Sequence, residues 1–213
     1  MKHTIARAIA AGALSILAVC PVLARDSFTL PHIGTMSVPA HVMFEKGDQA
    51  SLSFPKGIRT FFARSGATGG TYYTMTYANG PHFSYGWAVS QTLGIPWFSH
   101  AGLRQYTTRS AEEQLDAAAS YINQALIRQR AVYTGPAPLV KINDKKNPRW
   151  EGSFLTVTKE RDILYKENYL MSLQTDGYFV YCGMINSDGE QKELTAELSA
   201  MFSKRRLPKS MRS

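Results

Sequence analysis

The chain has 213 residues, a formal net charge of +8 and two cysteines, Cys20 and Cys182. Taking away the two cationic residues near the N-terminus and the five among the last ten residues leaves about +1 for the rest, so the charge does not indicate a nucleic-acid groove. Cys20 lies in a segment that we expect to be removed, which leaves one cysteine and excludes an internal disulfide.

Residues 1–24 have the pattern of a secretory signal, with two cationic residues before an apolar stretch over residues 8–19 and small residues up to Ala24. We therefore expect cleavage after Ala24 and a periplasmic or secreted protein that begins at Arg25. A retained membrane anchor is one alternative, although a spanning helix needs about 20 apolar residues and this stretch is shorter. A lipoprotein modified at Cys20 is another, because residues 17–20 loosely resemble a lipobox.

The first part of the mature chain predicts short strands. Three prolines interrupt short apolar runs in residues 25–57. Aromatic and β-branched residues dominate residues 59–64 and 71–77, which flank the small-residue stretch 65–70 and predict a hairpin. Asn79-Gly80-Pro81 predicts a turn after the second of these strands. Residues 82–106 have an irregular pattern, within which residues 85–93 predict a short helix.

The clearest single element is a helix over residues 110–130. Ser110 and Glu113 have the spacing of a capping box, in which each side chain bonds the backbone N–H of the other. Apolar residues then fall on one helical face, and Gly135-Pro136 follows the expected end.

The second half predicts a meander and a closing helix. Strands are expected over residues 139–142, 150–158, 163–173 and 178–185, with Leu164 and Leu170 breaking the alternation of the third. Asp176-Gly177 predicts a hairpin turn. The last strand is apolar on both faces, as a central strand is. Ser187 and Glu190 predict a second capping box before a helix whose buried stripe includes Leu194, Leu198, Met201 and Phe202.

This order of elements predicts an α+β fold with a mostly antiparallel sheet and two amphipathic helices. We expect one domain over residues 25–203, followed by a basic C-terminal tail over residues 204–213.

The helix from Ser110, the strands over residues 150–185 and the closing helix together resemble the PsbP-like family. The resemblance is one of architecture, covers about half of the mature chain and includes no signature motif. It implies an exported α+β domain that acts as an accessory or assembly factor rather than as an enzyme, and it implies no catalytic residues.

Motifs for known chemistries are missing from the sequence. The loop over residues 65–70 has no lysine and leads into a strand, so it is not a phosphate-binding loop. The histidines lack metal-ligand spacing, and no nucleophile elbow occurs. Cys182 lies in the most apolar strand and is expected to be a core residue. We therefore expect no metal and no cofactor.

Aromatic residues are dense between Phe61 and Tyr106, where they could form either a core or a pocket. The candidates for contact with a ligand or partner are His82, Trp87, Trp97, Phe98 and His100. Membrane-surface contact is a separate candidate role for the basic residues of the tail, which are Lys204, Arg205, Arg206, Lys209 and Arg212.

The sequence thus favours an exported, non-enzymatic accessory or binding protein of the bacterial periplasm, with another envelope protein or an anionic membrane as partner and no nucleic acid. One alternative is an exported hydrolase that uses His82 or His100 as its base. The other is a membrane-surface protein held by its basic tail.

Overall fold

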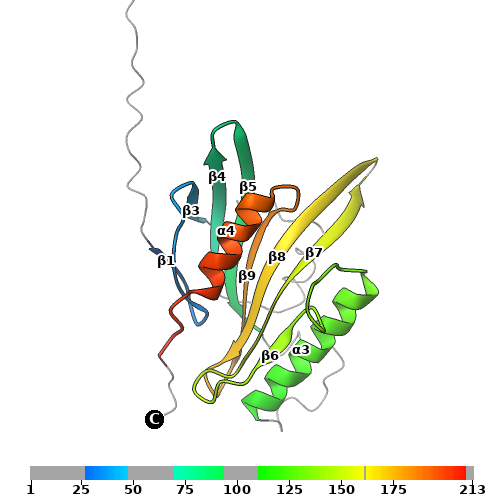
Figure 1. The fold of residues 1–213 in the computed structure, drawn as a ribbon. Helices are drawn as coiled ribbons and strands as arrows, with labels where there is room; N and C mark the ends of the chain where they lie inside the picture. The colour runs from blue at the N-terminus through cyan, green and yellow to red at the C-terminus, as the bar shows by residue number, and fades with distance from the viewer. Residues whose placement is uncertain (1–26, 48–69, 94–109, 161, 210–213) are drawn as a thin grey trace, which may run out of the picture.

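The computed structural model describes residues 27–47, 70–93, 110–160 and 162–209 (Figure 1). In chain order the elements are β1 (Ser27–Leu30), β2 (Gly34–Ser37), β3 (Val42–Gly47), β4 (Thr71–Asn79), β5 (His82–Thr92), α3 (Ala111–Arg128), β6 (Val140–Ile142), β7 (Arg149–Glu160), β8 (Ile163–Thr175), β9 (Val180–Asp188) and α4 (Lys192–Ser203). The predicted α+β class and the order of strands, helix, strands and helix are confirmed.

Seven strands form one sheet in the order β3-β4-β5-β9-β8-β7-β6, while β1 and β2 form a separate hairpin. Each neighbouring pair is antiparallel. β9 lies between β5 and β8, and its residues from Val180 to Ser187 are all buried. The prediction of a central strand is therefore confirmed, although this strand begins two residues later than expected, so that Tyr178 and Phe179 belong to the preceding turn.

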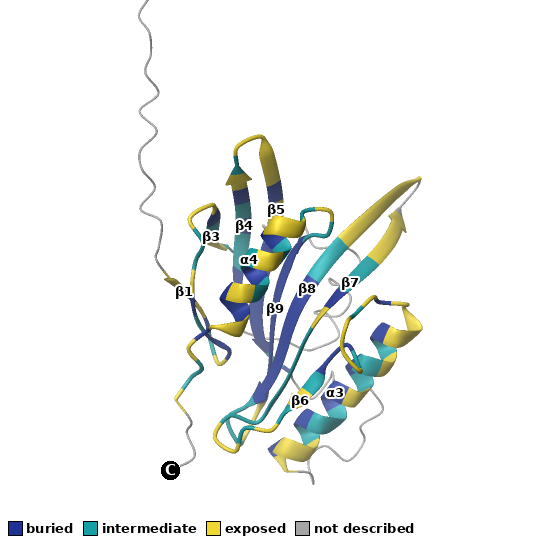
Figure 2. Ribbon diagram, in the orientation of Figure 1, coloured by how far each residue is buried: buried dark blue, intermediate teal, exposed yellow. Residues whose placement is uncertain are grey.

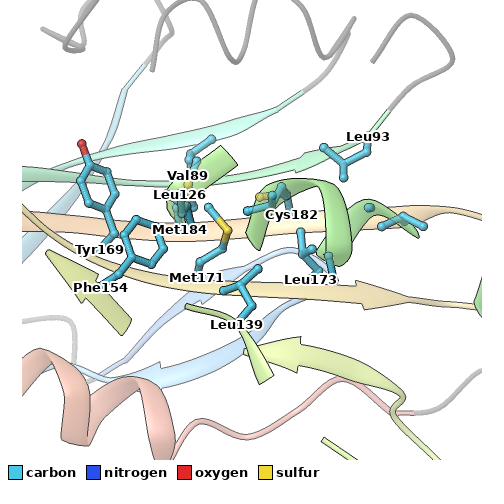
Figure 3. Packing of buried hydrophobic residues seen from close by; sticks show 14 of the residues in the cluster. Val89, Leu93, Leu126, Leu139, Phe154, Tyr169, Met171, Leu173, Cys182 and Met184 are labelled. Atoms are coloured by element: carbon cyan, nitrogen blue, oxygen red, sulfur yellow. The ribbon is translucent and has the colours of Figure 1, made fainter. Parts of the chain in front are cut away.

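The sheet carries a separate apolar core on each face, because successive side chains of a strand point to opposite sides. Met171 and Met184 pack with the buried stripe of α3, in the core shown in Figure 3. Leu170 and Ile185, one residue away on the same strands, pack with α4 and the β1–β2 hairpin. Figure 2 shows the buried centre of the sheet and its exposed strand ends.

The helix α3 begins as predicted. The Ser110 hydroxyl accepts a hydrogen bond from the Glu113 N–H at 3.2 Å, and the Glu113 carboxylate accepts one from the Ser110 N–H at 2.8 Å. Both N–H groups would otherwise lack a partner at the helix start. The capping box is confirmed.

The second predicted capping box is wrong. Ser187 is a buried residue of β9, and the residue before α4 is Gln191, whose side chain makes no capping bond. The local spacing was correct for a cap, but the pairing of Ser187 with Asn168 of β8 extends the strand through this position.

The predicted helix over residues 85–93 is also wrong, because this segment forms most of β5. It pairs with β4 as far as Ser90 and with β9 from Trp87 to Thr92. Gly86 permits this arrangement, since a Cβ atom there would lie 2.2 Å from the Asn186 carbonyl oxygen. The alternation of the segment is thus that of a strand, and its partner β9 is far away in sequence.

The predicted turn at Asn79-Gly80-Pro81 and the predicted hairpin turn at Asp176-Gly177 are both confirmed. Gly80 joins β4 to β5 with a φ of 59°, and Gly177 lies in the β8–β9 turn with a φ of 100°, both in the left-handed region that favours glycine. The expected strand over residues 59–64 and all but the last residue of the loop over residues 65–70 lie outside the described residues.

Candidate functional site

A groove with a volume of about 200 Å³ lies between α4 and β7. Its floor comes from two rows of paired residues, Ser153–Leu170–Ile185 and Leu155–Asn168–Ser187, each running across β7, β8 and β9. One wall is the side of α4 that carries Thr195, Leu198 and Ser199, and the other is the segment after α3, Val132, Tyr133 and Thr134.

The groove is apolar with a rim of hydroxyl groups. None of its described lining residues is Asp, Glu, Lys, Arg or His. The side-chain amide of Asn168 is held in place by two linked hydrogen bonds. Its Nδ2 donates to Thr195 Oγ1 at 2.6 Å, and the Thr195 hydroxyl donates in turn to the Gln191 carbonyl at 3.0 Å. Such a surface suits an apolar group with a few hydrogen-bonding atoms rather than an ion.

Exposed apolar side chains continue from the groove onto a two-stranded ribbon, formed by residues 157–160 of β7 and 163–166 of β8. The ribbon extends past the last residue of β9 that pairs with β8, which is Asp188. Val157 and Leu164 lie on the α4 face, 49% and 62% exposed, and Val132 beside the groove is 58% exposed. On this face Val157 follows the groove residue Leu155, whereas Lys166 and Lys159 are the cross-strand partners of Val157 and Leu164, so apolar and charged side chains alternate along the ribbon.

The outer edge of β7 is open along this ribbon. Leu155 exchanges two backbone hydrogen bonds with Val132, at 2.7 and 2.8 Å, so its N–H and C=O point away from β8. Those of Val157 point the same way, because backbone groups alternate along a strand. Within the described residues no strand pairs with this edge beyond Leu155.

On the opposite face, Tyr169 donates its hydroxyl hydrogen bond to the Glu167 carboxylate at 3.1 Å, and Asn186 Nδ2 donates to the same carboxylate at 3.4 Å. Burial and then the negative charge of Glu167 hold the pKa of Tyr169 far above its usual range. The tyrosine is therefore a neutral donor that fixes the carboxylate.

The described histidines do not form a site together. His41 and His82 are exposed near one end of β4, where the His41 carbonyl accepts from the Ala78 N–H and His82 pairs with Asn79. His32 is exposed in the β1–β2 turn and stacks on the Tyr181 ring at a centroid distance of 3.7 Å. Within the described residues, no three His, Cys, Asp or Glu side chains converge as a metal site would require.

The predicted aromatic contact set is only partly described. Trp87 is 4% exposed and packs edge-on against Tyr169 in the α3-side core, because odd-numbered residues of β5 face that core. It is therefore a core residue and not a surface contact. His82 is exposed on β5, and Trp97, Phe98 and His100 lie outside the described residues.

The predicted basic tail needs one correction. Arg205 is 8% exposed: its Nε donates to the Ile33 carbonyl at 3.0 Å, its Nη1 donates to the Phe202 carbonyl at 2.9 Å, and its Nη2 pairs with Glu151. Arg206 exchanges backbone hydrogen bonds with Thr35, although it is exposed like Lys204 and Lys209. Arg212 lies outside the described residues.

Cys182 is confirmed as a core residue. It is fully buried, and burial raises the pKa of its thiol to about 12, so the reactive thiolate does not form near neutral pH.

Comparisons with protein-family models, with characterised proteins and with solved structures give no match for this chain. Among the described helices, none has the length and apolar character needed to cross a bilayer.

The groove was not predicted from the sequence, because its residues come from β7, β8, β9, α4 and the segment after α3. Serine, threonine and leucine in these positions are unremarkable one by one. The ribbon did leave a signal: Leu164 breaks the strand alternation, and it is one of the exposed apolar residues.

Proposed function

We propose that this chain is an exported, non-enzymatic accessory protein of the bacterial periplasm that binds an apolar segment of a partner protein. The secretory pattern of residues 1–24 supports export. The observation that supports binding is an uncharged groove that borders the exposed Val132 and lies beside the open edge of β7. The PsbP-like resemblance stays a prediction that agrees with such a role.

The open edge of β7 suits an extended segment of the partner. A strand added there would pair with the outward N–H and C=O of Val157 and could place one side chain in the groove. Backbone pairing would supply affinity, and the groove would select a side chain without charge. The hydrolase alternative is less well supported, because His82, the described one of its two candidate bases, is exposed at the start of β5 and lies outside the groove.

Binding is tested with extended peptides selected from a random library on the protein. Ser153→Trp fills the groove from an exposed position of β7, and we expect it to weaken the selected peptides at least about tenfold, or 1.4 kcal/mol. Ser120→Trp makes the same change on the exposed side of α3 and should leave binding unchanged. Equal affinity in both variants would place the peptide site elsewhere.

Export is tested separately by expressing the full chain in a bacterium and sequencing the N-terminus of the protein in the periplasmic fraction. Cleavage after Ala24 gives a chain that begins at Arg25. Recovery of the unprocessed chain in the cytoplasm would contradict export without affecting the binding test.

A further inference from the structure

At the end of the sheet opposite the ribbon, two connections leave side by side. Ile142 pairs with Arg149, Arg149 with Gln174, and Gln174 with Tyr181. The β6–β7 connection (residues 143–148) and the β8–β9 turn (residues 176–179) therefore lie at the same end, about 10 Å or two strand spacings apart. Figure 1 shows this turn end at the bottom of the molecule.

The β8–β9 turn presents two aromatic rings at its tip. Tyr178 is 78% exposed and Phe179 is 58% exposed. Their backbone N–H groups both donate to Asp176 Oδ1 at 2.9 Å, and the Tyr181 hydroxyl donates to Asp176 Oδ2 at 2.6 Å. The turn is thus fixed by its own hydrogen bonds, so its rings can enter an apolar phase without leaving these N–H groups unpaired.

The neighbouring connection presents cations. Lys145 and Lys146 are exposed, and among the described residues no carboxylate lies within ion-pairing distance of either. The acidic side chain between these strands, Asp144, is already bonded by the N–H groups of Lys146 and Asn147 and by the Arg149 guanidinium at 3.1 Å. The positive charge of this connection is therefore available to a partner, whereas its negative charge is not.

Two further cations lie on the segment after α4. The backbone of Arg206 pairs antiparallel with Thr35, and a segment in that direction runs toward the β1–β2 turn and the turn end. Arg206 and Lys209 are both exposed on it. Arg205 does not contribute, because its guanidinium is buried.

We propose that the turn end docks on an anionic bilayer, with Tyr178 and Phe179 in the headgroup region and Lys145, Lys146, Arg206 and Lys209 facing lipid phosphates. Aromatic rings at the tip with cations beside them are the pattern of interfacial contact. A flat bilayer reaches such a tip without a matching cavity. The ribbon does not fit a bilayer in this way, because the turn at its end carries Asp162, whose carboxylate lies 3.6 Å from Lys159 Nζ on β7. This docking does not depend on the proposed peptide site.

The test compares variants of the same full-length chain by co-sedimentation with vesicles, so that any contribution of the N-terminal segment is common to all. Vesicles of phosphatidylcholine alone are compared with vesicles that also contain phosphatidylglycerol. We expect the wild type to bind the mixed vesicles more tightly. Lys145→Glu/Lys146→Glu should weaken that binding at least about 25-fold, since each cation near the surface contributes about fivefold.

Matched variants locate the contact. Tyr178→Ser/Phe179→Ser should weaken binding to mixed vesicles about tenfold or more, whereas Ile163→Ser/Tyr165→Ser removes two exposed apolar side chains from the ribbon and should have no effect. Lys46→Glu/Lys192→Glu makes the same charge change at two exposed positions on β3 and α4 and should weaken binding less than twofold. Equal losses for the two lysine pairs would reduce the effect to general charge attraction and overturn the proposal.

A measurement that gives a gain of signal is also needed, because one of the variants above could lose binding simply by failing to fold. Phe179→Trp places a fluorophore at the tip, and its emission should be quenched by lipids brominated near the headgroup, beyond the quenching of the wild type. No added quenching would overturn the proposal, as would equal binding of the wild type to both kinds of vesicle. If the protein still binds the selected peptides in that case, its partner is another protein and not a bilayer.

Discussion

The ribbon end and the turn end of the sheet both expose large apolar side chains. The two ends differ in whether the turn itself carries a charged or an aromatic side chain. In the ribbon, Asp162 lies in the turn beyond Ile163 and Leu164, and its carboxylate pairs with Lys159, the cross-strand partner of Leu164. At the turn end, the exposed Tyr178 and Phe179 lie in the turn itself, and the exposed cations lie on the neighbouring segments. The ribbon therefore suits a protein partner that approaches it from the side. The turn end suits a flat anionic surface that meets its turn.

The two ends also differ in how many neighbouring strands and side-chain contacts hold them in place. The ribbon is a pair of strands without a third strand beside it in the described residues, and such a pair is only marginally stable in water. Near the turn end, β8 has β7 on one side and β9 on the other, and the buried Arg205 joins β7 to the β1–β2 hairpin. We expect the turn end to be rigid and the ribbon to adapt to its partner.

The largest expected effect on stability comes from the buried arginine that holds the turn end. Arg205→Ala should lower the free energy of unfolding by about 3 kcal/mol, because it removes charge-assisted hydrogen bonds to the Ile33 and Phe202 carbonyls and one of the two cations that pair with Glu151. Urea denaturation measures the change. Arg206→Ala, at the exposed neighbour, should stay within about 0.5 kcal/mol. A loss below about 1 kcal/mol for Arg205→Ala would mean that the turn end is not held in this way.

Native-state hydrogen exchange should separate the two ends along a single strand. Amides of β8 from Leu170 to Leu173, buried between two strands, should open only with the whole domain. Paired amides of the ribbon over residues 163–166 should open locally, at a free energy lower by about 3 kcal/mol or more, which corresponds to over a hundredfold faster exchange. Equal protection would show that the ribbon is as rigid as the turn end.

A smaller effect is expected from acid at the β8–β9 turn. Burial acts to raise the pKa of Asp176, but the hydrogen bonds from the Tyr181 hydroxyl and the Phe179 and Tyr178 N–H groups outweigh it, so this pKa lies below its usual value. The stabilisation is therefore complete above the unfolded-state pKa of about 3.9 and is lost as the pH falls through the lower folded-state value.

Asp176→Asn should accordingly lower the free energy of unfolding by about 1 kcal/mol near neutral pH, and the difference from wild type should shrink in strong acid. Denaturant unfolding across this pH range provides the measurement. A difference that is constant with pH would show that the carboxylate charge is not what holds the turn.

The smallest effect is expected in the ribbon itself. Ile163→Ala should change the free energy of unfolding by no more than about 0.5 kcal/mol, because the side chain is 58% exposed and packs on little. Thermal or urea unfolding is sufficient to measure it. A loss above about 1 kcal/mol would mean that the ribbon is part of the folding core, and its apolar residues would then need no partner to explain them.

Elements whose signals are local in sequence were predicted correctly. The α3 capping box depends on residues three apart, and the Asp176-Gly177 turn depends on neighbours, so both could be identified without knowing the fold. The buried position of Cys182 followed from the apolar character of its own strand. These features gave the α+β class and most strand positions.

The sites could not be predicted in the same way. Residues 85–93 became a strand because β9 pairs with them from about a hundred residues away, and Ser187 was drawn into β9 by its pairing with β8. The groove combines residues of several elements, none of which carries a motif. Trp87 was a candidate contact because it lies in a segment dense in aromatic residues, and density does not show that its side chain faces the core.

The sequence by itself thus determined the secretory pattern, the fold class, the first helix start and the hairpin turns, because each depends on neighbouring residues. Only the tertiary structure decided which basic and apolar residues are available to partners. Arg205 is buried by contacts with Ile33 and Glu151, which are 172 and 54 positions away, while Lys145 and Lys146 stay free because Asp144 is bonded within its own turn. Burial and charge pairing are set by long-range contacts, so composition alone could not separate these cations.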